Sequence, residues 1–266
     1  MKTSIIIPTY NLSWMTINLL DSIRHTVDQG EYNIVLVDNG SAEGEFSAVL
    51  KHVYLYHRSP GHIFHHTKEQ LGFVKAVNRG ISIARGAGCT NVFILNNDTI
   101  VTGDWFYRMG ESLKQSTTGI VGCMTNGPDW RDYPHPQMMI KEKMSYEQIK
   151  KHIEPYSAAR ARHFFGEVQD VNFHPFFCVG MSMRMIEDIG MLDEDFGMGL
   201  FDDDDYCYRA LQAGWKIKSR LDVYVHHYHR SSWIEHNIDY DKLLKENRTI
   251  FKNKHGFDPW DRVKSN

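Results

Sequence analysis

Four polar residues at the end of a short apolar run are the first candidates for chemistry in this chain. Residues 93–95 (Phe-Ile-Leu) lead directly into residues 96–99 (Asn-Asn-Asp-Thr). A short continuous apolar run is typical of a strand buried in a parallel sheet, and open α/β sheets bind ligands at the carboxyl ends of their strands. A carboxylate and two amides at that edge are suited to hold a metal ion, a phosphate or a sugar. The alternative is ordinary turn chemistry, in which Asp98 or Thr99 ends the strand or caps a helix.

Two earlier apolar runs deliver polar residues to the same edge. The run 4–7 (Ser-Ile-Ile-Ile) predicts a buried strand that Pro8 stops. The run 34–37 (Ile-Val-Leu-Val) predicts a second strand, which ends in a carboxylate at Asp38. Because the carboxyl ends of parallel strands share one edge of a sheet, these segments and residues 96–99 begin to define a pocket.

Residues 202–205 are four consecutive aspartates, the densest charge cluster in the chain. Adjacent carboxylates repel, which raises the pKa of some of them, whereas a helix N-terminus or a nearby cation favours the charged forms. Complementing a helix dipole accounts for one or two of the four, because residues 206–213 continue as a helix before Gly214. A calcium loop is disfavoured, since Asp-x-Asp-x-Asp-Gly spacing is absent. The functional hypothesis makes at least one aspartate a general base in a cleft.

Three histidines follow a later apolar run. Residues 223–225 (Val-Tyr-Val) predict a strand, and His226, His227 and His229 come directly after it. A histidine after a strand is more often structural than bound to a metal, but three within four residues favour one imidazole facing the pocket. The sequence does not distinguish which of the three it is.

The elements that must position these residues alternate between strands and helices. The predicted helices cover residues 13–27 with Ser13 as N-cap, 71–84, 104–114, 145–152, 206–213 and 241–252, which stops near Gly256, and the further strands cover residues 53–56, 119–123 and 176–183. This alternation indicates a doubly wound, parallel α/β sheet with right-handed crossovers. No GxGxxG follows the first strand and no GxxxxGK[ST] is present, so dinucleotide-binding and P-loop functions lose their main support.

Two other segments allow both a structural and a functional interpretation. Gly72 allows close backbone approach at the start of its helix, and Asn78 lies on a mainly polar side of that helix, where a solvated face is the simpler interpretation. The segment 126–175 begins as an irregular stretch rich in aromatic and proline residues. Exposed aromatic side chains stack on sugar faces, but more often they pack against the domain surface.

Composition limits the class of protein. The 266 residues, 42% hydrophobic and 24% charged, suit one large α/β domain or two small ones, and a net charge of -3 provides no basic field for nucleic acid. Four widely spaced cysteines without CxxC pairing indicate buried thiols in a reducing compartment. No apolar run suits a signal peptide or a membrane span. A cytoplasmic protein is therefore expected, with peripheral contact to a membrane left open.

The ordered set of motifs resembles the family 2 glycosyltransferases, inverting enzymes of GT-A fold that use nucleotide sugars. Each motif alone is unspecific, but their order and spacing match over most of the chain. The matching segments are residues 4–11, 37–41, 71–73, 78–80, 95–99, 202–209 and 226–229. The resemblance implies a GT-A type α/β fold, a Rossmann-like mixed, mainly parallel sheet flanked by helices. It divides a single domain into a nucleotide-sugar-binding half (1–125), an acceptor-binding and catalytic half (126–232) and a C-terminal helical segment (233–266).

The resemblance also implies a role for each matching residue. Asp38 matches the acid that reads the pyrimidine ring, whereas Asp98 and His227 match the residues that hold a divalent cation at the diphosphate. Asp202 and Asp203 match the acid pair that meets the acceptor, with Asp203 as the candidate base. The other donor-site residues implied in this way are Pro8, Thr9, Tyr10, Asn11, Gly72, Asn78, Asn96 and Asn97. Asn96 stands where the family often has an aspartate, so weaker metal binding is expected.

The implied activity is the transfer of a hexose or deoxyhexose from a UDP or dTDP sugar to a hydroxyl acceptor, assisted by Mn²⁺ or Mg²⁺. The Asn-Asn-Asp-Thr variant resembles the branch with many rhamnosyltransferases, and the expected acceptor is a glycan, a lipid-linked glycan or a protein. One alternative is a nucleotidyltransferase, which would carry a glycine-rich loop with a lysine, unlike residues 8–11 (Pro-Thr-Tyr-Asn). The other is a non-catalytic sugar- or metal-binding module, which Asn96 permits.

Overall fold

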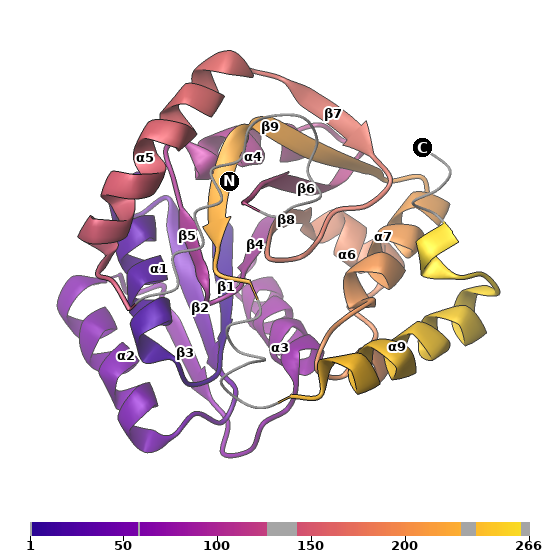
Figure 1. Cartoon of the computed structure of the whole chain (residues 1–266), viewed down its shortest axis with the longest axis horizontal. Helices are drawn as coiled ribbons and strands as arrows, with labels where there is room; N and C mark the ends of the chain where they lie inside the picture. The colour runs from indigo at the N-terminus through magenta and orange to yellow at the C-terminus, as the bar shows by residue number, and fades with distance from the viewer. Residues whose placement is uncertain (1, 58, 127–142, 230–237, 262–266) are drawn as a thin grey trace.

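The structure is a computed structural model that describes residues 2–57, 59–126, 143–229 and 238–261. Within these residues one nine-stranded sheet has the order β3-β2-β1-β4-β8-β6-β9-β5, and β7 pairs with β9 (Figure 1). The strands are β1 (Thr3–Thr9), β2 (Tyr32–Asp38), β3 (Ile63–His66), β4 (Asn91–Leu95), β5 (Thr99–Val101), β6 (Thr118–Met124), β7 (Val168–Val171), β8 (Cys178–Ser182) and β9 (Lys216–His227).

The first four strands in space, β3, β2, β1 and β4, are all parallel. Beyond β4 the sheet becomes mixed, because β8 is antiparallel to both β4 and β6, while β9 is parallel to β6 and antiparallel to β5 and β7. Since one sheet continues across residue 125, the nucleotide-sugar-binding half and the acceptor-binding half expected from the sequence share a scaffold.

Helices cover both faces of this sheet (Figure 1). They are α1 (Ser13–Thr26), α2 (Glu43–Tyr56), α3 (Phe73–Gly86), α4 (Trp105–Leu113), α5 (Tyr146–His163), α6 (Met183–Ile189), the 3-10 helix η1 (Glu194–Phe196), α7 (Asp202–Gln212) and α9 (Tyr240–His255). Alternate residues of β1 divide the core: Ile6 packs with the apolar side chains of α3, α6, α7 and α9, whereas Ile5 and Ile7 pack with those of α1, α2 and α4. Strands buried on both faces explain the continuous apolar runs.

Two local predictions are wrong. Residues 53–56 are the end of α2 rather than a strand, and the third strand lies later, at β3. Val49 and Val53 are buried four residues apart while the next three side chains are exposed, so the apolar period is helical. Ser13 does not cap α1: Leu12 precedes the helix in a left-handed conformation, and the Ser13 amide donates to Glu45 Oε2 at 2.6 Å.

The predicted helices differ from the structure only in their ends, whereas α6 lies where no helix is predicted and begins at the last residue of the strand predicted over 176–183. The helix predicted over 145–152 continues to His163 as α5, and the helix predicted from residue 206 already begins at Asp202 as α7. α9 ends at a left-handed Gly256, as the sequence indicates. All four cysteines are buried free thiols. None of the helices in the described ranges has the length and apolar character needed to cross a membrane.

Candidate active site

The carboxylate of Asp98 and the imidazole of His227 meet at the carboxyl end of β4. Asp98 lies in the turn between β4 and β5, and β5 pairs with β9 so that Thr99 is opposite His227. His227 Nε2 lies 3.1 Å from Asp98 Oδ1, and the backbone amide of Tyr228 donates to the Asp98 carbonyl at 3.0 Å. Strand register therefore joins two residues that are distant in the sequence.

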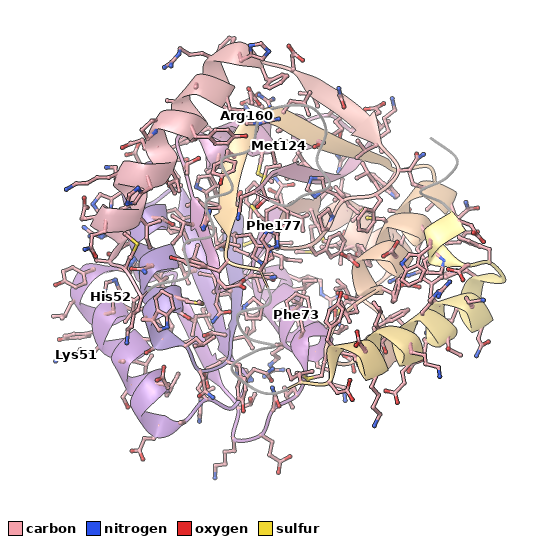
Figure 2. All side chains as sticks on the ribbon, in the orientation of Figure 1. Lys51, His52, Phe73, Met124, Arg160 and Phe177 are labelled. Carbon is pink, nitrogen blue, oxygen red and sulfur yellow. The ribbon has the colours of Figure 1, made fainter. Side chains whose placement is uncertain are left out.

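Two neighbours fix the orientation of His227. Its ring stacks on Phe177 with the centroids 5.2 Å apart, and Phe177 lies near the middle of the molecule in Figure 2. The Asn126 amide brackets the His227 backbone, because Asn126 Oδ1 accepts from its N–H at 2.8 Å and Asn126 Nδ2 donates to its carbonyl at 3.0 Å. Sequence reasoning missed both Phe177 and Asn126, since neither belongs to a motif.

Electrostatics favour the charged form of Asp98. Burial by itself raises the pKa of this carboxyl, but the charge of His227 and the hydrogen bond from it outweigh the burial, so the pKa lies below its ordinary value. Asp98 therefore presents a buried anion at the strand edge. A buried anion next to an imidazole is a donor pair that suits a divalent cation.

The structure separates the three candidate histidines. His226 points into an apolar cluster with Tyr224 and Tyr228, and burial lowers its pKa to about 4. Adjacent residues of a strand face opposite sides, so His227 faces Asp98 while His226 does not. The ring of His229 lies 4.3 Å from that of His227, and its charge also helps to lower the pKa of Asp98.

Asn96, two residues before Asp98 in the sequence, carries a further side-chain oxygen. Its Oδ1 is buried and has no hydrogen-bond partner among the described residues. Such an acceptor is costly to leave unpaired, and a neutral amide oxygen is an accepted ligand for a hard cation. No group of three or more His, Cys, Asp or Glu side chains with metal-binding geometry occurs in the described ranges. The residues present thus fit a cation whose coordination is completed by a ligand such as a diphosphate.

The loops after β1 and β2 are joined by hydrogen bonds around Asp38. Asp38 Oδ1 accepts from the Ser41 amide at 3.1 Å and from His66 Nδ1 at 2.8 Å. The Asn11 amide donates to Ser41 Oγ at 2.7 Å, and Asn11 Oδ1 accepts from the Ala42 amide at 2.9 Å. The sequence-predicted residues Asp38 and Asn11 are therefore brought together at one strand edge.

His66 is a residue of this edge that sequence reasoning missed. It is opposite Asp38 in the parallel register of β2 and β3, and its ring stacks on Phe46 at a centroid distance of 4.4 Å. The sequence predicts the third strand at residues 53–56, and a strand there does not pair His66 with Asp38. A prediction that places the third strand at residues 63–66 would identify His66 as the partner of Asp38.

Some predicted donor-site residues have side chains that bond within the protein. Asn97 Nδ2 lies 3.2 Å from Thr16 Oγ1 and 3.5 Å from Thr9 Oγ1, which ties the ends of β1 and β4 to α1. Asn78 donates to the Leu192 carbonyl at 2.9 Å and accepts from the Leu192 amide at 3.1 Å. The structure shows these two amides as links between elements, and Asn78 is buried rather than on a solvated helix face.

Gly72 shows why a glycine stands at the start of α3. Its φ is +90°, and a Cβ there would lie 2.7 Å from the carbonyl oxygen of Gly197. The Val74 amide donates to that same carbonyl at 3.1 Å. The start of α3 and the loop before α7 are therefore in direct backbone contact, which no larger residue at position 72 allows.

Asp202 and Asp203 begin α7 and have no ion pair with a cation among the described side chains. Burial and the neighbouring charge of Asp203 raise the pKa of Asp202 well above its ordinary value. Burial raises the pKa of Asp203 to about 6, although the backbone amides of Asp204 and Phe176 oppose the rise. A carboxylate with a pKa near neutrality is suited to accept a proton.

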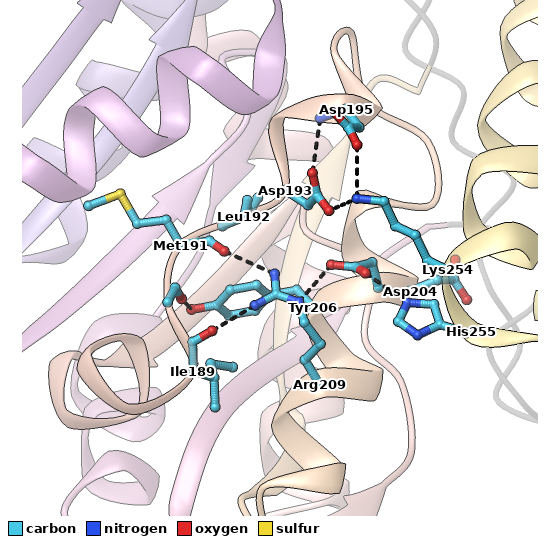
Figure 3. Close-up of polar contacts among 12 residues, drawn as sticks. Ile189, Met191, Leu192, Asp193, Asp195, Asp204, Tyr206, Arg209, Lys254 and His255 are labelled. Atoms are coloured by element: carbon cyan, nitrogen blue, oxygen red, sulfur yellow. Dashed lines mark hydrogen bonds and ion pairs between the residues drawn. The ribbon is translucent and has the colours of Figure 1, made fainter.

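Asp205 belongs to a different network, part of which is drawn in Figure 3. Its carboxylate accepts from Arg209 Nε at 2.8 Å and lies 2.8 Å from His255 Nε2. Arg209 also donates to the carbonyls of Ile189 and Met191, both at 2.9 Å. Of the four consecutive aspartates, Asp202 and Asp203 therefore have no cation beside them among the described side chains, whereas Asp205 forms a structural ion pair.

A comparison of the sequence with known families agrees with this fold. Residues 4–189 match the model of glycosyl transferase family 2. The chain belongs to this family. The match ends before the loop and helix that carry Asp202 and Asp203, so those residues are placed by the structure. No curated protein sequence matches the chain.

Solved structures of similar fold are glycosyltransferases. A mannosyltransferase from Pyrobaculum calidifontis, in complex with GDP-Man and Mn²⁺, has a TM-score of 0.63 and 18% identity over 87% of this chain and 59% of its own. GalNAc-T7 with UDP, GalNAc and Mn²⁺ has a TM-score of 0.64 and 14% identity over 85% of this chain and 43% of its own. TarS 1–349 from S. aureus has a TM-score of 0.59 and 16% identity over 97% of this chain and 74% of its own.

These similarities confirm the predicted fold class, a mixed α/β domain of GT-A type with helices on both faces of its sheet. At 14–18% identity they concern the fold alone. This chain also spans less than two thirds of the mannosyltransferase and of GalNAc-T7.

Proposed function

We propose that this protein is an inverting glycosyltransferase that moves a sugar from a UDP or dTDP sugar to a hydroxyl group of an acceptor. The observation that carries the proposal is the Asp98–His227 pair at the carboxyl edge of the sheet of a family 2 chain. A buried carboxylate and an imidazole at this edge fit a cation that binds a nucleotide diphosphate.

The donor side of the site is formed by strand ends. Asp38, with Asn11 and Ser41 around it, would receive the base of the nucleotide, because these groups converge where β1 and β2 end. Of the other residues that the sequence assigns to the donor, Pro8, Thr9 and Tyr10 lie at the end of β1, whereas Gly72 marks the start of α3. Asn78 and Asn97, whose side chains bond within the protein, and Asn96 stay candidates for positions that line the donor site.

Asp98 and His227 would hold the divalent cation, Mn²⁺ or Mg²⁺, with the amide oxygen of Asn96 as an additional ligand. When bound, that cation supplies Lewis-acid stabilisation of the diphosphate as it leaves. Mn²⁺ accompanies the nucleotide in both the mannosyltransferase and GalNAc-T7 structures, which supports a cation in the same role here.

On the acceptor side, Asp203 would act as the general base, with Asp202 beside it. The acceptor oxygen attacks the anomeric carbon, its proton passes to the Asp203 carboxylate, and the bond between the anomeric carbon and the diphosphate oxygen breaks. Attack opposite the leaving group inverts the anomeric centre. The raised pKa of Asp203, about 6, makes this carboxylate a stronger base than an ordinary aspartate while leaving it charged at neutral pH.

The sugar and the acceptor are narrower proposals. The Asn-Asn-Asp-Thr segment at 96–99 favours a hexose or deoxyhexose of the rhamnosyl type, on the strength of the motif alone. The acceptor is a glycan, a lipid-linked glycan or a protein, and the protein would work in the cytoplasm or at the membrane surface.

A non-catalytic sugar- or metal-binding module is the second candidate, because it would retain the strand-edge pair but need no base. The raised pKa values of Asp202 and Asp203 favour the enzyme, since a raised carboxyl pKa suits proton transfer and is not needed to hold a cation at Asp98. The nucleotidyltransferase alternative is disfavoured, because the chain has no glycine-rich loop with a lysine directly after β1.

The first test is a thermal-shift panel of UDP, dTDP and GDP, each with and without Mn²⁺ or Mg²⁺, followed by hydrolysis of the matching nucleotide sugar. A ligand that binds only the native state raises the apparent melting temperature. A metal-dependent shift with one pyrimidine diphosphate and slow hydrolysis of its sugar are expected. A shift without any hydrolysis or transfer leads to the binding module, and no shift with any nucleotide contradicts the glycosyltransferase and likewise favours the non-catalytic module.

A further inference from the structure

The loop that leads into Asp202 has an unusual backbone. Leu200 and Phe201, the two residues directly before Asp202, both have positive φ, +73° and +64°, and so does Gly199 at +101°. Residues other than glycine rarely adopt this left-handed conformation, because the side chain crowds the backbone. Such strain persists only where the surrounding structure compensates for it, and it is common next to reactive groups.

Asn247 on α9 provides that compensation. Its side chain is buried, and its Nδ2 donates to three carbonyls of the strained loop, those of Phe196 at 3.0 Å, Gly199 at 2.7 Å and Leu200 at 3.1 Å. The Phe196 carbonyl also accepts from the Gly199 amide at 3.0 Å, so loss of the Asn247 amide would leave that carbonyl one donor and take this donor from the Gly199 and Leu200 carbonyls. One side chain thus supports the backbone that sets the direction of Asp202 and Asp203.

Other contacts hold α9 against the same region without touching those carbonyls. The Phe201 ring packs beside Phe251 and Trp260 at centroid distances of 6.5 and 6.4 Å. The Lys254 ammonium pairs with Asp193 and Asp195, which Figure 3 shows on the turn around η1. α9 is therefore fixed by packing and ion pairs, and Asn247 is the contact that acts on the loop backbone itself.

The strained loop also touches the donor side. The Gly197 carbonyl accepts from the Val74 amide at the start of α3, directly after Gly72. The loop thus lies between the start of α3 and the acids on α7, so a change in its backbone alters the distance between the two sides of the reaction. Group transfer is sensitive to such displacements, since a misplacement of about 1 Å can cost about 100-fold in rate.

We propose that Asn247 is a positioning residue for the Asp202–Asp203 pair, acting through the carbonyls of the loop 196–201. The inference rests on the proposed function, because it assigns Asn247 to the geometry of the acceptor-side base. The Asn247 amide bonds to the loop carbonyls and lies on α9, away from the strand ends assigned to the donor. Its removal should slow turnover and leave nucleotide binding at β1, β2 and β4 unchanged.

The test compares two variants with a matched control on the same helix. Asn247→Ala removes the donor, and Asn247→Asp keeps the shape but turns an oxygen toward the three carbonyls. Asn253→Asp makes the same charge change at an exposed position of α9. We expect kcat per folded molecule to fall about 100-fold in both Asn247 variants, with donor KM and the UDP–Mn²⁺ thermal shift within threefold of the unaltered protein. Asn253→Asp should resemble the unaltered protein in every measurement.

Kinetics are measured below the melting temperature of each variant and normalised to its folded fraction, so that lost stability does not count as lost turnover. Backbone hydrogen exchange is followed in parallel. The expected local signature is that Asn247→Ala speeds exchange relative to the unaltered protein more in the segment 196–205 than in β1. An Asn247→Ala protein that keeps kcat per folded molecule within threefold overturns the positioning role.

Failure of the proposed function is recognised separately. If the unaltered protein turns over no nucleotide sugar, the glycosyltransferase proposal fails, and exchange alone then decides the role of Asn247. At least tenfold faster exchange confined to 196–205 in Asn247→Ala supports it. An equal change in exchange rate in that segment and in β1, each relative to the unaltered protein, overturns it.

Discussion

The site contains two carboxylate regions that differ in how they are built and in how readily they keep a proton. At the edge of the sheet, Asp98 emerges from a strand end and is paired with the imidazole of His227, which lowers its pKa despite burial. At the start of α7, Asp202 and Asp203 follow a strained loop, have no cation beside them, and have raised pKa values. Environments that push carboxyl pKa values apart mark different chemical tasks. The first region is suited to hold positive charge and the second to accept a proton.

Asp205 shows that the difference arises from surroundings rather than from residue type. It stands two residues after Asp203 on the same helix, yet it is bound by Arg209 and His255. The side chains of a helix turn away from each other by about 100° per residue, so neighbours in the sequence enter separate environments. The comparison between the two regions yields four predictions, from the largest expected effect to the smallest.

Asp203→Asn should reduce turnover about 10²- to 10⁴-fold, because it removes the group proposed to take the acceptor proton. Nucleotide affinity should change little, since the donor contacts lie at the strand ends. The measurement is steady-state transfer with a donor titration. Asp204→Asn is the control, because it makes the same charge change one residue later and keeps the backbone amide that donates to Asp203 Oδ1 at 3.0 Å. Equal losses in the two variants would show that Asp203 has no special role.

Asp98→Asn should raise the Mn²⁺ concentration needed for a nucleotide-dependent thermal shift by roughly 100-fold or more, because it replaces the proposed anionic ligand with a neutral one. His227→Ala should act in the same direction, whereas His226→Ala should not, since His226 faces the apolar cluster. The check is a metal titration at saturating UDP. A metal requirement that is unchanged in Asp98→Asn would remove the sheet edge from the cation site.

The pH profile should distinguish the two regions. Because a general base acts in its charged form, kcat/KM should fall about tenfold per pH unit below an apparent pKa near 6. That value belongs to the coupled Asp202–Asp203 pair rather than to one residue. Rates measured from pH 4.5 to 8 at saturating metal give the profile. If kcat/KM instead falls only near pH 4, where an ordinary aspartate titrates, burial does not raise the apparent pKa of this pair in solution.

The smallest predicted effect is on stability. Because the folded-state pKa of Asp203 is raised, this carboxyl favours the native state fully below its unfolded pKa near 4, and that contribution is lost as pH rises through about 6. Asp203→Asn should therefore raise the free energy of unfolding by on the order of 1–2 kcal/mol at pH 7 and by little at pH 4.

Denaturant unfolding at both pH values provides the measurement. Asp98→Asn is the opposite case: it should lower stability at pH 7, because it removes a charged partner of His227. If both variants shift stability in the same direction at pH 7, the contrast between the two regions is wrong.

Much of this architecture follows from local sequence. The apolar runs that form β1, β2 and β4 are long enough and uniform enough to identify buried strands, and the polar residues after each one place Asp38 and Asp98 at a common edge. Four adjacent aspartates before a helical pattern likewise place Asp202 and Asp203 at the start of α7. These features depend on the period and order of residues, which the sequence determines by itself.

Other features depend on contacts between distant segments, and only the tertiary structure decides them. The register of β5 with β9 selects His227 over His226, because a shift of one residue turns the other face of the strand to Asp98. Because residues 53–56 belong to α2, the third strand is β3, and its register with β2 pairs His66 with Asp38. The left-handed backbone before Asp202, and the Asn247 amide that supports it, have no local sequence signal, because the strain is compensated by a helix some fifty residues later.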